Sequence, residues 1–133
     1  MRRARATRAL LTALAFVFAT ALLGQGVERR GQAWLDARTE PAAINVNGAW
    51  HAGQWGRVTL NQAQGSREVT GSGDGWDILG VVSGTKVCLL FLSKGRVAYA
   101  AELTPDGPDA LNGRYADGLL TERSKTRLMH FTK

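Results

Sequence analysis

The sequence predicts an all-β fold: a small antiparallel up-and-down meander or barrel of seven or eight strands, preceded by an N-terminal hydrophobic helix. From residue 45 onward, short β-type runs alternate with clusters of Gly, Asp, Asn and Ser, and no helical period occurs. This argues against alternating helices and strands. Before that region, an uncharged apolar run follows four arginines. The 133 residues leave room for one compact domain plus this appendage.

Residues 1–27 have the layout of an export signal. Arginines at positions 2, 3, 5 and 8 precede the apolar run, and no further charge occurs until Glu28. A positive start followed by a hydrophobic stretch sends the chain across a membrane and keeps the arginines on the cytoplasmic side. The apolar side chains expected to form the membrane anchor are Leu10, Leu11, Leu14, Phe16, Val17, Phe18, Leu22 and Leu23. We therefore expect the rest of the chain to be extracytoplasmic.

Two outcomes for this segment stay open. Small residues at 19 and 21, or at 24 and 26, offer signal-peptidase sites, which would release the protein to the periplasm. Alternatively, residues 9–27 form 19 uncharged positions, close to the ~20 that span a bilayer, and would anchor the protein in the inner membrane. Gln25 stands where a lipoprotein signal needs cysteine, which excludes lipidation.

Residues 28–46 are expected to form a partly helical stalk or linker. Helix-favouring residues continue to Arg38, and Pro41 ends the helix. Trp34 is the largest apolar side chain of this segment. It fits the membrane interface, where indole rings accumulate, a contact with a neighbouring protein, or an incidental aromatic in a linker.

Residues 47–133 are expected to form the β domain. The strands are expected at residues 49–52, 56–62, 66–72, 76–83, 86–93, 96–104, 111–116 and 125–132. Turn residues separate them at 64–65, 73–75, 84–85, 94–95 and 105–108. Such short connections predict antiparallel neighbours. Closure into a barrel hides the edge strands, and an open two-layer meander is the alternative.

The run at residues 87–92 is apolar on both faces, which predicts a strand covered once by the core and once by something else, such as a partner. A barrel of this size is filled by its own side chains and leaves little space for a ligand. The expected interior side chains include Trp50, Leu60, Leu79 and Leu103.

Several short motifs carry a family resemblance. They are Asn-Gly-Ala-Trp at 47–50, the run at 56–62 and Glu-Val-Thr-Gly-Ser at 68–72, with later strands at 111–115 and 130–133. The domain thereby resembles small secreted calycin-like barrels, the lipocalin and avidin group. The resemblance implies that Trp50 packs across one end of the barrel. It does not imply ligand binding, because the hairpins are short and the avidin pocket needs more tryptophans and polar groups.

No constellation of residues predicts catalysis, a metal site or a cofactor. The net charge of +6 lies mostly at the front, with +4 on residues 1–46 and +2 on 47–133, so nucleic-acid binding is not expected. His51 and His130 fall on the first and last strands, without an acidic residue fixed beside them. Cys88, the single cysteine, is expected to be a buried, inert thiol. Aspartates at 74, 77, 106 and 109 suit turns better than calcium.

These observations predict a non-enzymatic interaction module, an accessory subunit that docks its barrel on a larger membrane-associated assembly. The alternative is a small binding protein that carries an apolar or aromatic ligand in the barrel mouth, lined by Trp50, Trp55, Trp76 and Tyr115. Basic residues on or beside the last strand would form one positive face, suited to anionic lipid or an acidic partner, or to protection of an edge strand. The residues expected to contact a partner or ligand are Trp34, Trp50, Trp55, Trp76, Tyr115, Arg123, Lys125 and Arg127.

Overall fold

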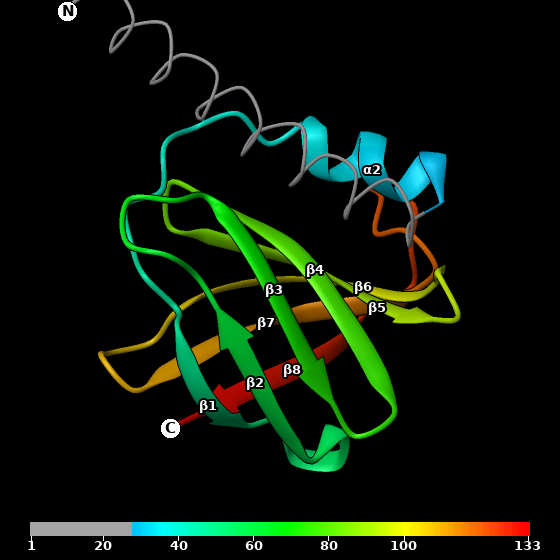
Figure 1. Cartoon of the computed structure of the whole chain (residues 1–133). Coiled ribbons are helices and arrows are strands. Elements are labelled where there is room, and N and C mark those ends of the chain that lie inside the picture. The colour runs from blue at the N-terminus through cyan, green and yellow to red at the C-terminus, as the bar shows by residue number, and fades with distance from the viewer. Residues whose placement is uncertain (1–27) are drawn as a thin grey trace, which may run out of the picture.

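The protein folds into a closed antiparallel barrel with one short helix on its outer surface, as a computed structural model of residues 28–133 shows (Figure 1). The elements are α2 (Arg29–Asp36), β1 (Gly48–His51), the 3-10 helix η1 (Gly53–Trp55), β2 (Arg57–Asn61), β3 (Glu68–Gly73), β4 (Trp76–Ser83), β5 (Lys86–Ser93), β6 (Arg96–Pro105), β7 (Ala110–Asp117) and β8 (Arg127–Thr132). The predicted all-β, up-and-down fold is confirmed. The expected anchor at residues 1–27 lies outside the described residues. From residue 28 on, no helix is both long and apolar enough to cross a membrane.

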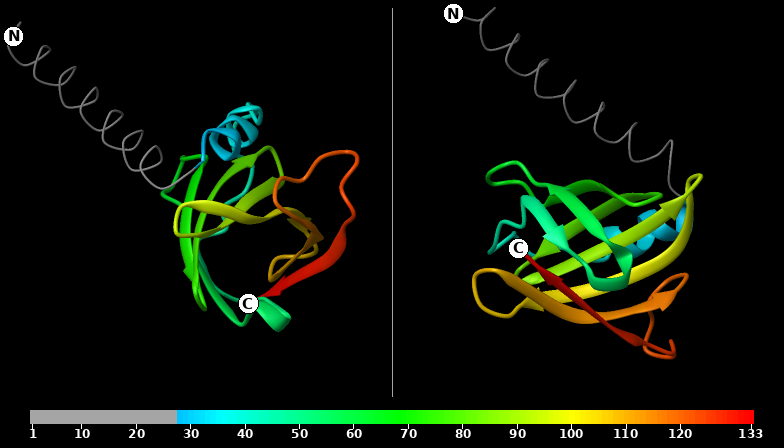
Figure 2. Two further views of the ribbon diagram at one scale, coloured as in Figure 1. Left: turned by 90° about the vertical axis from the view of Figure 1, so that its right-hand side faces the viewer. Right: turned by 90° about the horizontal axis from the view of Figure 1, so that it is seen from below.

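The strands follow each other around the barrel in chain order, and the pairing of β1 with β8 closes it (Figure 2). Closure decides between the two predicted architectures, since an open meander would leave β1 and β8 apart. All eight predicted strands form: β4 and β5 have the predicted bounds, and the ends of the others shift by at most two residues, as at β8, which begins at Arg127 and not at 125. One end of the barrel carries η1, the β3–β4 and β5–β6 turns and the β7–β8 loop. The other end carries the β2–β3, β4–β5 and β6–β7 connections.

Alternating side chains fill the barrel interior. Leu60, Leu103, Phe91 and Phe131 are fully buried there, together with Trp50. Leu79 was expected among them, and this prediction was wrong. Its strand is apolar on both faces, and the register places Leu79 opposite Leu90, on the outer face of the sheet.

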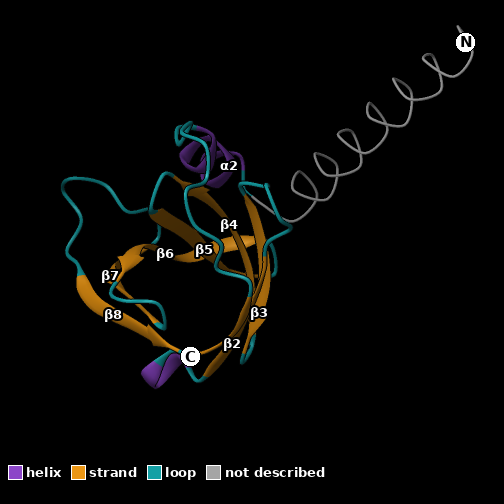
Figure 3. Ribbon diagram, turned by 90° about the vertical axis from the view of Figure 1, so that its left-hand side faces the viewer, coloured by secondary structure: helices purple, strands orange, loops and turns teal. Residues whose placement is uncertain are grey.

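Helix α2 covers this outer face (Figures 1 and 3). Trp34 and Leu35 pack there against Cys88, Leu90 and Leu92 of β5. The second cover predicted for the doubly apolar strand is therefore the chain's own helix, and not a partner. For the same reason the helix does not stand apart as a stalk, and Trp34 is buried against the barrel.

The segment between α2 and β1 is fastened to the barrel end that carries the β2–β3 and β4–β5 connections. Ala43 N donates to Gly84 O at 2.8 Å, and Gly84 N donates to Pro41 O at 3.0 Å. Further along, the buried Gln62 side chain accepts a hydrogen bond from Val46 N at 2.8 Å. It also donates to Ile44 O at 3.1 Å. Residues 41–46 are therefore a fixed part of the barrel.

Candidate functional site

Five aromatic rings meet at the end of the barrel that carries η1, and we call this group the mouth cluster. It consists of Trp55, Trp76, Phe91, Tyr99 and Tyr115. The Trp55 ring is central: its centroid lies 4.8 Å from that of Tyr99 and 5.1 Å from those of Phe91 and Tyr115. The rings meet edge to face or tilted, the arrangements that aromatic quadrupoles favour. The cluster therefore fills the mouth with the protein's own rings.

The local sequence explains how Trp55 reaches this place. A single 3-10 turn ends at Trp55, and Gly56 follows with φ at +74°, a conformation that favours glycine. The turn is closed by Ala52 N, which donates to Gly56 O at 2.8 Å. Gln54 Nε2 then donates to the Tyr115 hydroxyl at 3.1 Å, linking η1 to β7. Trp55, Trp76 and Tyr99 remain partly exposed at the rim.

The predicted grouping of aromatic residues is correct for three of its four members. Trp55, Trp76 and Tyr115 come together, but Trp50 lies at the other end of the barrel. Its indole Nε1 donates to Val46 O at 3.0 Å, and Lys133 Nζ lies 5.0 Å from the ring centroid. Trp50 faces inward from the four-residue strand β1 and packs against Phe131. It therefore closes one barrel end, as the family resemblance implied, and cannot line the mouth.

A second feature lies where β8 meets β1, and we call it the seam. The two strands share a single paired position, His51 with Thr132. A groove of about 690 Å³ runs between η1 and the rest of β8, lined among others by Gln54, Trp55, Leu128 and His130. Leu128 is 90% exposed, the one large hydrophobic side chain of residues 28–133 that lies open to solvent. The alternation of Leu128 and His130 with the buried Met129 and Phe131 in the sequence indicates this outward face.

The basic residues near β8 form only part of the predicted positive face. Arg127 bends over the mouth, 5.1 Å from the Tyr115 ring centroid, and its Nη2 lies 2.9 Å from Asp117 Oδ1. Arg123 and Lys125 are exposed in the loop before β8, not on the strand as expected for residue 125. The positive charges of these three residues therefore lie in the β7–β8 loop and at the start of β8.

The two histidines and the cysteine do not combine with further ligands. His51 and His130 both line the groove, and His130 Nδ1 is hydrogen-bonded to Asn112 Oδ1. No group of three metal-ligating side chains occurs among residues 28–133. Burial beneath α2 raises the pKa of the Cys88 thiol, and a hydrogen bond and the positive charge of Arg38 oppose this rise.

Fold and site together define a small up-and-down β-barrel protein with a filled interior, an aromatic plug at one end and an incompletely closed seam. Comparisons with protein-family models, curated proteins and solved structures found no significant match for this chain.

Proposed function

We propose that this protein is a non-enzymatic, extracytoplasmic interaction module that serves as an accessory subunit of a membrane-associated assembly. The barrel is compatible with the calycin-like group, and we propose membership of that group for its architecture alone. One observation carries the proposal: side chains occupy the space where a calycin would hold a ligand. Leu60, Phe91, Leu103 and Phe131 are fully buried in that interior. With the interior occupied, the outer surface is what remains for recognition.

The position of Glu28 supports a close association with the membrane. Its Oε1 accepts a hydrogen bond from Val97 N at 3.0 Å, so the chain is already fixed to β6 before α2 begins. If the preceding segment is retained as an anchor, the barrel is held near the bilayer without a free stalk. Arg30 and Arg96 are exposed beside this point, and they suit anionic headgroups.

The localisation is tested by fusing a reporter to Lys133 that is active only outside the cytoplasm. We expect activity in intact cells, because four arginines precede the apolar run. The subunit role is tested by dissolving the native membrane in mild detergent and measuring the size of the particle that contains the full chain. A large particle is expected. A cytoplasmic reporter, or a free monomer in detergent, would overturn the proposal.

A second candidate function is the carriage of a small apolar or aromatic ligand at the mouth. The partial exposure of Trp55, Trp76 and Tyr99 favours it, since three rings at one rim offer stacking surfaces. A panel of apolar and aromatic compounds, followed by tryptophan fluorescence, distinguishes the two. The interaction module predicts an unchanged spectrum, and saturable quenching would favour the carrier.

A further inference from the structure

Strand β8 has a free edge along most of its length. On one side it pairs with β7 from Arg127 to Thr132. On the other side only Thr132 has a partner, His51, and no other described residue of the chain extends that pairing. The ribbon shows β8 running away from β1 toward the β7–β8 loop (Figure 2). Unpaired backbone groups at a sheet edge are a template for another strand.

The hydrogen-bond pattern shows which backbone groups face the seam. Lys133 N donates to Asp109 O at 2.9 Å, which makes these two residues a hydrogen-bonded pair at the end of the β7–β8 ladder. In an antiparallel ladder such pairs alternate with pairs whose backbone groups point outward. The register is regular from Tyr115–Arg127 to Ala110–Thr132. The N–H and C=O groups of Leu128 and His130 therefore point away from β7, into the groove.

The groove offers room and a side-chain contact for an added strand. Its volume is about 690 Å³, and the residues that line it include the apolar Trp55 and Met129. Leu128, 90% exposed, stands on the outer face of the same edge. A strand laid against β8 would cover this side chain and pair the free backbone groups.

We propose that the free edge of β8 binds an extended, acidic segment of a partner protein by strand addition. This inference rests on the proposed function, and it names the surface and the kind of partner. Main-chain hydrogen bonds to Leu128 and His130 would supply the pairing, and side chains at alternate positions of the segment would supply selectivity.

Charge complementarity selects the occupant. The residues that line the groove include one cationic side chain, Arg127, and no acidic residue. The preceding loop carries the exposed Arg123 and Lys125 against one exposed acidic residue, Glu122, and Arg114 is exposed on β7 beside Leu128. Asp117 forms an ion pair with Arg127. A second copy of this chain would bring the same positive edge against itself, because a twofold contact places identical patches together. An acidic strand is attracted where a second copy is repelled.

The proposal is tested by adding a synthetic peptide to the full-length protein. The peptide has about eight residues, in which Glu and Asp alternate with Val and Thr. We expect the largest amide shifts at Leu128 and His130 in NMR spectra, together with slower hydrogen exchange of these two amides. The control peptide has equal charge, with prolines in place of Val and Thr, and it cannot pair with a strand edge. It should bind about tenfold more weakly or worse. Equal binding of both peptides, or shifts scattered over the basic side chains, would overturn strand addition and leave a purely electrostatic contact.

A pair of substitutions gives a second, independent measurement. Leu128→Pro removes an N–H that faces the groove and leaves the hydrogen bonds between β8 and β7 intact. Edge strands tolerate proline at positions of this kind, where the N–H does not pair with the neighbouring strand. Leu128→Ala keeps that N–H. We expect the proline variant to bind the peptide about tenfold or more weakly than the alanine variant, because both lose the side-chain contact and only the proline variant also loses the N–H. If both variants bind the peptide as the wild type does, the edge is not the site.

The same variants separate this inference from the proposed function. In the full chain, Leu128→Pro should release the protein from the large detergent particle, whereas Leu128→Ala should not. If the Leu128→Pro variant is still found in the large particle, strand addition at β8 is wrong and the subunit role is unaffected. If the wild type itself is monomeric in detergent, the subunit role fails, and the peptide measurement still decides whether the edge binds.

Discussion

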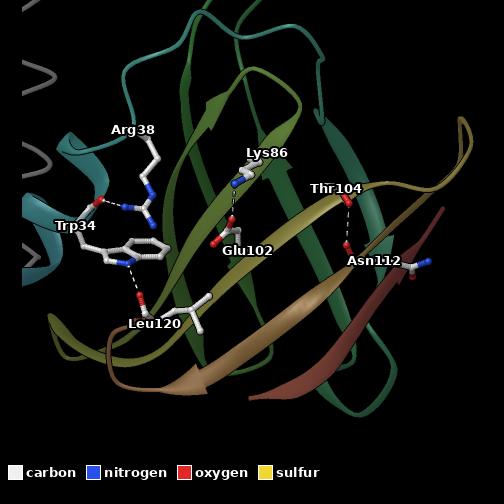
Figure 4. Close-up of polar contacts among 7 residues, drawn as sticks. All are labelled: Trp34, Arg38, Lys86, Glu102, Thr104, Asn112 and Leu120. Carbon is white, nitrogen blue, oxygen red and sulfur yellow. Dashed lines mark hydrogen bonds and ion pairs between the residues drawn. The ribbon is translucent and has the colours of Figure 1, made fainter. Parts of the chain in front are cut away.

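The indole Nε1 of Trp34 donates a hydrogen bond to the carbonyl oxygen of Leu120, 2.8 Å away (Figure 4). This contact joins the helix that precedes the barrel to the loop that precedes its last strand, 86 residues later in the chain. The Arg38 guanidinium lies over the same ring, 4.3 Å from its centroid, and donates to Trp34 O at 3.1 Å. Trp34 therefore fastens α2, β5 and the β7–β8 loop to one another.

Substitution of Trp34 should lower the stability of the whole barrel. Trp34→Ala removes a ring that is 9% exposed, and we expect a loss of about 3–5 kcal/mol in the free energy of unfolding. Trp34→Phe keeps an aromatic ring but leaves the buried Leu120 carbonyl unpaired, at a cost of about 1–3 kcal/mol. Urea denaturation followed by circular dichroism measures both. Leu128→Ala, at the 90% exposed position, is the control and should change the value by less than about 0.5 kcal/mol. Values for Trp34→Ala no larger than the control would show that the helix is not docked in solution.

Cys88 reports on the same helix through its reactivity. Burial raises the pKa of its thiol, so the folded protein holds the proton to higher pH than the unfolded chain does. We expect slow alkylation of the native protein at about pH 8 and a rate typical of a free thiol in urea. Trp34→Ala should accelerate the native reaction, because the helix covers the sulfur.

The sign of the linked pH effect follows from the same shift. The contribution of the Cys88 thiol to stability is complete below the pKa that the thiol has in the unfolded chain. It declines as the pH rises from that pKa to the higher pKa that the thiol has in the folded protein. Unfolding free energies of the wild type should fall more steeply at alkaline pH than those of Cys88→Ala. Parallel curves for the two proteins would contradict the assignment.

The strands could be predicted from sequence because their turns are explicit, whereas the docking of α2 could not. Both β5 and α2 have apolar residues that must be buried. The periodicity of the sequence predicts which residues of one element share a face, but it does not predict which distant element packs against that face. For the same reason Leu79 was assigned to the wrong side of β4. Trp50 and Trp55 are both expected at the mouth, yet the indole of Trp50 on β1 reaches Val46 at one barrel end, whereas Trp55 on η1 lies at the other.

Gly113 should tolerate no side chain, because β6 passes too close to it. A Cβ at this position would overlap the Glu102 carbonyl oxygen and lie 2.8 Å from the Leu103 Cα. Gly113→Ala therefore forces β6 and β7 apart, and we expect a loss of about 1–3 kcal/mol or more in unfolding free energy. At Gly73 the nearest atom to an added Cβ is Val58 Cγ2 at 3.4 Å. Gly73→Ala is the matched control and should be nearly neutral, within about 0.5 kcal/mol. Equal effects of the two substitutions would contradict the close approach of β6 and β7.

Removal of the central mouth ring should create a site that the wild type lacks. Trp55 contacts four other rings, so Trp55→Ala leaves an apolar space about the size of an indole, and such spaces bind small aromatic molecules. We expect free indole to raise the melting temperature of this variant and not that of the wild type. Trp50→Ala, at the other barrel end, shows whether the rescue is specific to the mouth. Stabilisation of the wild type by indole would instead support ligand carriage.

Gln62 provides the most exacting test of the polar contacts, because it is 5% exposed and all its side-chain groups are engaged. Its Oε1 accepts from Val46 N, and its Nε2 donates to Ile44 O and to Ser66 O at 2.8 Å. Gln62→Glu has the same shape but replaces the donor by a carboxylate that faces two carbonyl oxygens. At neutral pH we expect a loss of about 3–5 kcal/mol.

The pH dependence of this variant distinguishes charge from shape. Burial and the two carbonyl oxygens favour the protonated acid, so the pKa of the new carboxyl in the folded state lies above its value of about 4.3 in the unfolded chain. The penalty is therefore complete above the folded pKa and is relieved as pH falls through it. Gln62→Leu leaves the same carbonyls unpaired without adding a charge, so its loss of about 2–4 kcal/mol should not vary with pH in that range. Urea titrations of both variants between about pH 4 and 8 measure the difference, and a loss for Gln62→Glu that does not change with pH would show that the carboxyl reaches solvent and that residues 41–46 are not fixed to the barrel.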